Sequence, residues 1–126
     1  MVGMTAAIYQ GVMMNTLDTD IWVDLPSRQY MRLWKLIREQ GGMAMSPVLY
    51  VLKDGKVVNF LFEVTGLRSF DAEYRCALNL KIEGQRVKVL PLARVLKSKK
   101  TIMRDKDLPH IPLMERVLAA NRNLKK

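Results

Sequence analysis

The sequence predicts an α/β (α+β) fold in which a mixed β-sheet is flanked by helices. Three observations predict it. The chain of 126 residues has the length of one domain, segments with helical and with strand periodicity alternate along it, and no repeat, low-complexity tract or Pro/Ser/Gly linker divides it. We therefore expect a single domain over residues 1–126, with the element order α-β-α-β-β-α-β-β-α-α.

The first 40 residues are predicted to form a helix, a strand and a second helix. Residues 4–11 are predicted as a short helix that Gly11 ends. Residues 18–24 alternate between apolar and acidic side chains, which is typical of a half-buried strand. Residues 27–40 suit a helix because Pro26 and Ser27 favour a helix start and apolar side chains recur at Tyr30, Leu33, Trp34 and Ile37.

Two hairpins are predicted from turns that contain glycine. Asp54-Gly55 separates the β-rich segments 48–53 and 56–64, and we expect a two-residue type I′ turn, in which both residues have positive φ. Gly84-Gln85 is expected to join a second pair of strands, residues 77–83 and 86–90.

The remaining segments are predicted as helices. Residues 70–77 form a short one, and residues 91–102 and 107–121 form the last two. Pro109 and Pro112 fall in the first turns of the final helix, where a missing N–H costs little.

The charge of the chain is unevenly distributed. Lysine and arginine outnumber aspartate and glutamate by 21 to 12, which gives a formal net charge of +9. Residues 1–85 hold nine basic and nine acidic groups, whereas residues 86–126 hold twelve basic and three acidic groups. A strongly basic segment favours a polyanionic or phosphate-rich partner such as nucleic acid.

The residue types also exclude several classes of protein. The single cysteine, Cys76, excludes an internal disulfide framework, and the single histidine, His110, makes a His/Cys zinc site implausible. No apolar run approaches the roughly 18 residues that a membrane span requires, and residues 1–12 lack the basic start of a secretory signal. We therefore expect a cytoplasmic protein with no membrane partner.

Two carboxylates stand one residue apart in the first predicted strand. Asp18 and Asp20 project from one face of that strand, about 6.6 Å apart along the backbone. Like charges held so close repel each other unless a cation lies between them, and Mg²⁺ prefers carboxylate oxygens as ligands. The pattern predicts a magnesium site, and the alternative is a strand end whose aspartates are solvated or cap the following turn.

The segments around this pair resemble a known family. Residues 2–12 and 15–25 contain a glycine, a helix and then Asp18-Thr-Asp20, and residues 94–108 contain Lys99 followed by Arg104-Asp-Lys-Asp107. Together they resemble the small bacterial nucleotidyltransferases of the DNA polymerase beta superfamily, most closely its toxin-like and uncharacterised branch. Residues 57–61, 69–77 and 85–92 are similar to further elements of that family, so the resemblance covers nearly the whole chain.

The resemblance implies a minimal nucleotidyltransferase-like fold. It also implies a role for each matched residue near the start of the chain. Gly3 and Met4 stand where the family has a small pair whose backbone amides hold the nucleotide phosphates. A glycine before a helix N-terminus is a plausible anion site on physical grounds as well. Asp18 and Asp20 would be catalytic residues that hold Mg²⁺.

The tail of the chain supplies the other implied site residues. Lys99 would neutralise phosphate charge, Asp107 would be a remaining catalytic carboxylate, and Arg104 would position the substrate or the lysine. An alternative for Lys97, Lys99 and Lys100 is a solvated helix face. His110 lies between two prolines, where a structural role is the alternative to a catalytic one.

The chain departs from the family pattern at several positions. Asn59 occupies the place of a third carboxylate, and its amide can offer one oxygen to a metal but neither charge nor a general base. Glu63 shares the strand face of Asn59 but lies about 13 Å away. Met4 replaces a small residue and narrows the approach to phosphate, and the family's usual first helix and strand would precede residue 1.

These observations predict a Mg²⁺-dependent nucleotidyltransferase-like protein that transfers a nucleoside monophosphate from an NTP to a hydroxyl of RNA, with tRNA as one candidate acceptor. The resemblance also implies a toxin-antitoxin component with a cognate antitoxin protein as partner. The first alternative is a catalytically inactive relative that binds nucleic acid or protein. The second is a metal-dependent nuclease that uses the same pair of aspartates.

Overall fold

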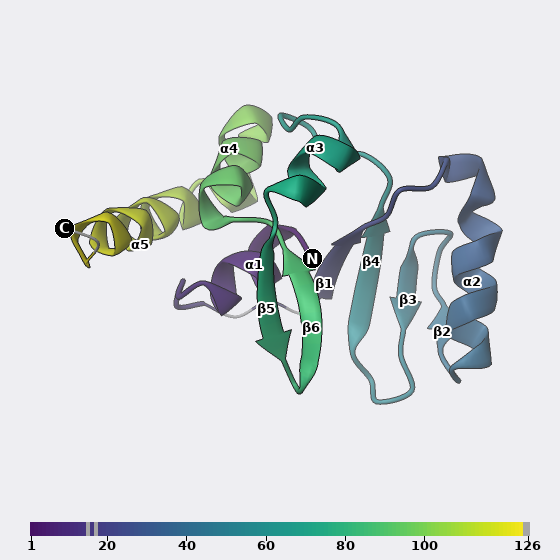
Figure 1. Cartoon of the computed structure of the whole chain (residues 1–126). Coiled ribbons are helices and arrows are strands. Elements are labelled where there is room, and N and C mark those ends of the chain that lie inside the picture. Colours follow the sequence, from purple (N-terminus) through teal and green to yellow (C-terminus); the bar gives the residue numbers. More distant parts are fainter. Residues whose placement is uncertain (15, 17, 125–126) are drawn as a thin grey trace.

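A four-stranded mixed sheet and a two-stranded hairpin form the β part of the molecule (Figure 1). The structure is a computed structural model that describes residues 1–14, 16 and 18–124. In the sheet, β1 (Asp18–Trp22) pairs in parallel with β4 (Val57–Leu61), and β3 (Leu49–Val51) pairs antiparallel with β4 and with β2 (Met43–Ala44). The hairpin consists of β5 (Leu78–Ile82) and β6 (Gln85–Val89).

Within the described residues, five α-helices surround these strands. The helices α1 (Gly3–Tyr9), α4 (Leu92–Ile102) and α5 (His110–Leu124) pack against one another beside β1, and α2 (Tyr30–Glu39) lies at the other end of the sheet next to β2 (Figure 1). The short helix α3 (Phe70–Arg75) precedes the hairpin. The structure is therefore an α+β fold, and the predicted element order is confirmed except for β2, a two-residue strand without a periodic signal.

The first hairpin turn differs from the predicted one. Gly55 has a positive φ of 88°, whereas Asp54 is not among the residues with positive φ, so the prediction of a type I′ turn is wrong. The N–H of Gly55 donates to the carbonyl of Leu52 (2.9 Å), and the N–H of Leu52 donates to the carbonyl of Lys56 (2.8 Å). This is the pattern of a three-residue loop that ends in a left-handed glycine.

The second hairpin turn lies one residue earlier than predicted. Glu83 and Gly84 are the turn residues, with φ values of 50° and 81°, as a type I′ turn requires. The apolar pattern could not decide the register, because both the observed and the predicted pairings place Leu80 and Val87 on the same face of the ribbon. The φ values of Glu83 and Gly84 are therefore what fixes the register.

Two apolar clusters form the core. One lies between α1, β6, α4 and α5 and contains Ala6, Ala7, Val89, Val95 and Met114, each no more than 1% exposed. The other lies between α2 and the sheet and contains Leu33, Ile37, Tyr50 and Phe60. A bilayer-spanning helix is absent from the described residues.

The first two residues join the sheet to the hairpin. The N–H of Val2 donates to the carbonyl of Asp20 in β1 (2.9 Å). The nitrogen of Met1 donates to the carbonyl of Lys88 (2.9 Å), and the carbonyl of Met1 accepts from the N–H of Leu90 (3.0 Å). Residues 1–2 therefore lie between β1 and β6 and connect strands that are distant in the sequence.

Gln10 connects the end of α1 to the beginning of α4. Its amide oxygen accepts from the N–H of Leu92 (2.7 Å), and its amide nitrogen donates to the carbonyl of Leu90 (2.8 Å). The residue before α4 is Pro91, whose side chain provides no cap. Gln10 therefore satisfies one of the unpaired N–H groups that every helix start leaves open.

We expect Gln10→Leu to lower the free energy of unfolding by about 1–3 kcal/mol, because it leaves two partly buried backbone groups without partners. Urea unfolding followed by circular dichroism measures the change. The control is Gln40→Leu at the exposed end of α2, for which we expect a change within about 0.5 kcal/mol. Equal losses in both variants would contradict the role of Gln10.

Candidate active site

A pocket of about 420 Å³ lies between the strands β1 and β4 and the segment that runs from α4 into α5. That segment includes a short 3₁₀ turn, η2 (Asp105–Asp107). The pocket is lined by every site residue that the sequence predicted: Gly3, Met4, Asp18, Asp20, Lys99, Arg104 and Asp107. The structure thus brings together residues from the two ends of the chain.

The strand β1 presents both aspartates to this pocket. In the sheet, Asp20 is the direct partner of Asn59 on β4, and the Asn59 amide donates a hydrogen bond of 3.3 Å to the Asp20 carboxylate. Burial raises the pKa of Asp20, and the negative charge of Asp18 raises it further. The hydrogen bond from Asn59 and the charges of Lys99 and Lys106 oppose that shift. The two carboxylates therefore share one electrostatic environment, as the spacing predicted.

Gly3 lies in close contact with the Asp20 carboxylate. The residue has a φ of +67°, and a Cβ atom there would overlap the Asp20 carboxylate. The carboxylate therefore lies directly over the first turn of α1, where an ordinary side chain has no room. Met4 is 8% exposed and belongs to the core cluster, although it also borders the pocket. Phosphate binding by the amides of Gly3 and Met4 stays a prediction.

A buried carboxylate organises the cationic wall of the pocket. Asp107 is 1% exposed, and its two oxygens accept from Lys99 Nζ (2.9 Å) and Arg104 Nε (3.0 Å). Burial alone would raise the pKa of Asp107, but the hydrogen bonds and charges of Lys99 and Arg104 hold it below its usual value. Since both oxygens are engaged, the geometry favours Asp107 as the group that positions Lys99 rather than as a metal ligand.

Several pocket residues were not selected from the sequence as site residues, among them Lys106, His110 and Glu63. Lys106 is exposed, borders the pocket, and has a charge that acts on Asp20. His110 borders the pocket as well, and its Nδ1 is the one buried side-chain nitrogen or oxygen of the described residues without a hydrogen-bond partner. The only sequence signal for either was its position in or just after the segment Arg104–Asp107. Glu63, which lies beyond the end of β4, also borders the pocket.

The side chains suit one kind of metal ion. Among the described residues, no group of three or more His, Cys, Asp or Glu side chains converges to hold a metal. Asp18 and Asp20, with the Asn59 amide beside them, form a smaller set of hard oxygen ligands. Such a set fits Mg²⁺, which is usually bound by one or two carboxylates together with water and substrate phosphates. It does not fit zinc, which prefers nitrogen and sulfur ligands.

Comparison of this chain with protein-family models, with curated proteins and with solved structures finds no match.

We expect Gly3→Ala to lower the free energy of unfolding more than a positive φ alone explains. Alanine in a left-handed conformation costs about 1–2 kcal/mol, and at Gly3 its Cβ also displaces the Asp20 carboxylate. The matched control is Gly55→Ala, where φ is also positive and no atom lies within 4 Å of the added Cβ. Chemical denaturation measures both variants. A loss at Gly3 no larger than that at Gly55 would show that Asp20 does not depend on this glycine.

We expect Asp107→Asn to cost about 3–5 kcal/mol of unfolding free energy near neutral pH, because it leaves the buried Lys99 ammonium without its counter-charge. The folded-state pKa of Asp107 lies below its ordinary value of 3.8. Its stabilisation is therefore present above pH 4 or so and is lost as the pH falls through the folded-state pKa.

The variant should accordingly show a weaker pH dependence of stability than the parent protein, which urea unfolding at about pH 7 and about pH 3 measures. Glu73 also has a lowered pKa, so Glu73→Gln serves as the control that keeps the contribution of Asp107. A pH dependence unchanged by Asp107→Asn would contradict this role.

Proposed function

We propose that the protein binds a nucleoside triphosphate with Mg²⁺ and transfers the nucleoside monophosphate to a hydroxyl of RNA. The observation that carries the proposal is the division of charge across one pocket. Asp18 and Asp20 line it from β1, Lys99 lines it from α4, and Lys106 and Arg104 line it from η2 and the residue before it. A triphosphate that carries a divalent cation has the complementary division, with a positive ion beside a row of anionic oxygens.

The acidic wall would bind the cation. Asp18 and Asp20 supply carboxylate oxygens from one strand face, and Asn59 holds the Asp20 carboxylate in place. When bound, Mg²⁺ stabilises negative charge on the attacking and leaving oxygens of phosphoryl transfer. Because two carboxylates leave most of its coordination sphere open, phosphate oxygens of the nucleotide have room to complete it.

The basic wall would bind the phosphates. Lys99 uses one N–H for Asp107 and keeps two further donors. Arg104 uses Nε for Asp107, so its terminal nitrogens remain able to bind phosphate oxygens. Asp107 thus fixes both cations before the substrate arrives, and such preorganisation lowers the cost of orienting charge during the reaction.

The reaction also needs an acceptor for the proton of the attacking hydroxyl. The amide of Asn59 cannot serve, although it lies beside Asp20. Among the described residues that line the pocket, Glu63 has no ion-pair partner and His110 has an unpartnered Nδ1. Either would be the candidate proton acceptor if the substrate brings the hydroxyl within hydrogen-bond distance.

A second candidate function is a catalytically inactive relative that binds nucleic acid or a partner protein on the same fold. Asn59 favours it, because a neutral amide stands directly beside Asp20 where the family has a carboxylate. The absence of a third acidic or histidine ligand among the described residues favours it as well.

The test is incubation of the purified protein with labelled NTPs, Mg²⁺ and RNA, including tRNA. We expect Asp18→Asn and Asp20→Asn each to lower label transfer about 100-fold or more, since several kcal/mol of charge stabilisation is removed. Asp20→Asn should remain folded, because burial already disfavours the charge of Asp20. The control is Asp24→Asn, which removes an exposed acid two residues beyond β1 and outside the pocket.

Three outcomes separate the candidates. Transfer that is lost in the Asp18 and Asp20 variants but kept in the Asp24 variant supports the enzyme. RNA binding without any transfer, equal in all variants, supports the inactive relative. Shortened RNA without incorporated label identifies a nuclease and contradicts the proposed transfer.

A further inference from the structure

The hairpin β5–β6 has two faces of different chemistry. Because side chains alternate along a strand, each pair of facing residues lies on one side of the ribbon. Leu80 and Val87 form one such pair and pack against the core cluster. The outer face carries two of the five facing pairs, Asn79 with Lys88 and Lys81 with Arg86. This outer face contains three cations and no acidic side chain.

The pair Lys81 and Arg86 places two like charges directly opposite each other. Both side chains are exposed, and like charges in this arrangement destabilise a hairpin. Neither forms an ion pair with an acidic group of the described residues. The nearest acid in sequence, Glu83 at the tip, instead accepts from Lys56 at 3.3 Å. The fold therefore leaves this repulsion uncompensated.

Several other cations of the basic last third are compensated within the fold. Arg94 pairs with buried Glu73, Lys99 and Arg104 pair with Asp107, and Lys100 pairs with Glu115. The net charge of the sequence indicated a polyanionic partner without locating it. Acidic side chains therefore offset part of the positive charge of α4 and η2. No ion pair of the described residues offsets the charges of Lys81 and Arg86 on the hairpin.

We propose that the outer face of the hairpin β5–β6 binds the phosphodiester backbone of an RNA strand. A phosphate between Lys81 and Arg86 removes their mutual repulsion and gives each a charge-assisted hydrogen bond. That the strand is RNA rests on the proposed function, whereas the charge of the surface does not. The contacts are to phosphate rather than to bases, because Tyr74 at the edge of this face already stacks on Phe70 and lies under Lys88.

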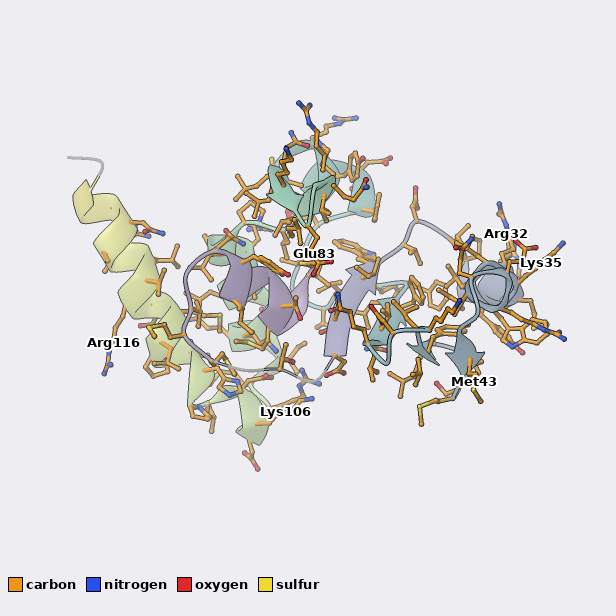
Figure 2. The ribbon with its side chains drawn as sticks, turned by 90° about the horizontal axis from the view of Figure 1, so that it is seen from below. Arg32, Lys35, Met43, Glu83, Lys106 and Arg116 are labelled. Carbon is orange, nitrogen blue, oxygen red and sulfur yellow. The ribbon has the colours of Figure 1, made fainter. Side chains whose placement is uncertain are left out.

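The hairpin and the pocket lie on different sides of the fold. In Figure 2 the hairpin is at the top of the molecule, and Lys106, which borders the pocket, is at the bottom. The hairpin would therefore hold a part of the RNA remote from its reacting end. Such binding acts on the association of substrate rather than on the chemical step, so its loss raises KM and leaves kcat unchanged.

The first test compares two variants of equal charge change in RNA binding by the full chain. Lys81→Glu/Arg86→Glu alters the hairpin, and Arg32→Glu/Lys35→Glu alters α2 at the far end of the molecule (Figure 2). The probe is a labelled single-stranded RNA of mixed sequence and about 20 nucleotides, without NTP or Mg²⁺. We expect the hairpin variant to raise Kd about 10-fold or more and to lower the salt slope of log K by about 1.4, for two phosphate contacts on a single strand.

The α2 variant should change Kd by less than about 2-fold at moderate salt, where distant charges are screened. Equal weakening by both variants would show that only net charge matters and would overturn the proposal.

The second test separates binding from folding. Lys81→Glu alone converts the like-charge pair into an opposite-charge pair with Arg86, so we expect Tm to rise by about 1–4 °C while RNA affinity falls. Unchanged RNA affinity in this variant overturns the proposal. Because the assay needs no nucleotide transfer, hairpin variants that bind RNA normally would refute this surface and leave the proposed reaction standing. Conversely, a protein without transfer activity would still show the hairpin effect.

Discussion

The junction between Val2 and Gly3 is the constraint on which the candidate site depends. Val2 pairs with the backbone of Asp20, and the left-handed φ of Gly3 turns the chain into α1 beneath the Asp20 carboxylate. Met1, one residue earlier, pairs with the backbone of β6. A segment of three residues therefore fixes β1 relative to the hairpin and to α1. The Asp20 carboxylate lies against Gly3, at a place where a Cβ atom would overlap it.

The helix α4 is the second fixed reference, and buried charge holds it in place. Glu73 is 2% exposed and pairs with Arg94 in the first turn of α4 and with Arg68 before α3. Asp107 does the same near the other end, through Lys99. A buried ion pair adds little to the free energy of unfolding by itself, but leaving one partner buried without the other lowers that free energy strongly. Each pair therefore favours the position of α4 in which both partners meet. The position of Lys99 across from β1 thus follows from contacts at both ends of the helix.

Except at the two hairpin turns, the sequence predicted what depends on neighbouring residues, and it missed several contacts between distant ones. The helices and strands follow from periodicity, and the shared face of Asp18 and Asp20 follows from their spacing, so these could be predicted. The pairing of Asp20 with Asn59 is set by the parallel register of strands 39 residues apart, which no local pattern encodes. The return of Asp107 to Lys99 requires the left-handed Met103 (φ 51°) at the end of α4, a conformation that glycine usually supplies. The sequence therefore named Asp107 as a site residue but could not show that both its oxygens would be used.

The fold contains a pair of neighbouring acids, Asp18 and Asp20, and a pair of facing cations, Lys81 and Arg86. In each pair the two like charges repel each other. Asp18 raises the pKa of Asp20, which finds a neutral amide rather than a cation at hydrogen-bond distance. Lys81 faces Arg86, and the acid at the hairpin tip is taken by Lys56. A sequence adapted only for stability would replace one member of each pair, since local rules are usually broken where function requires it. The two pairs have opposite sign, so the metal nucleotide and the RNA strand that we propose would each place an opposite charge beside one of them.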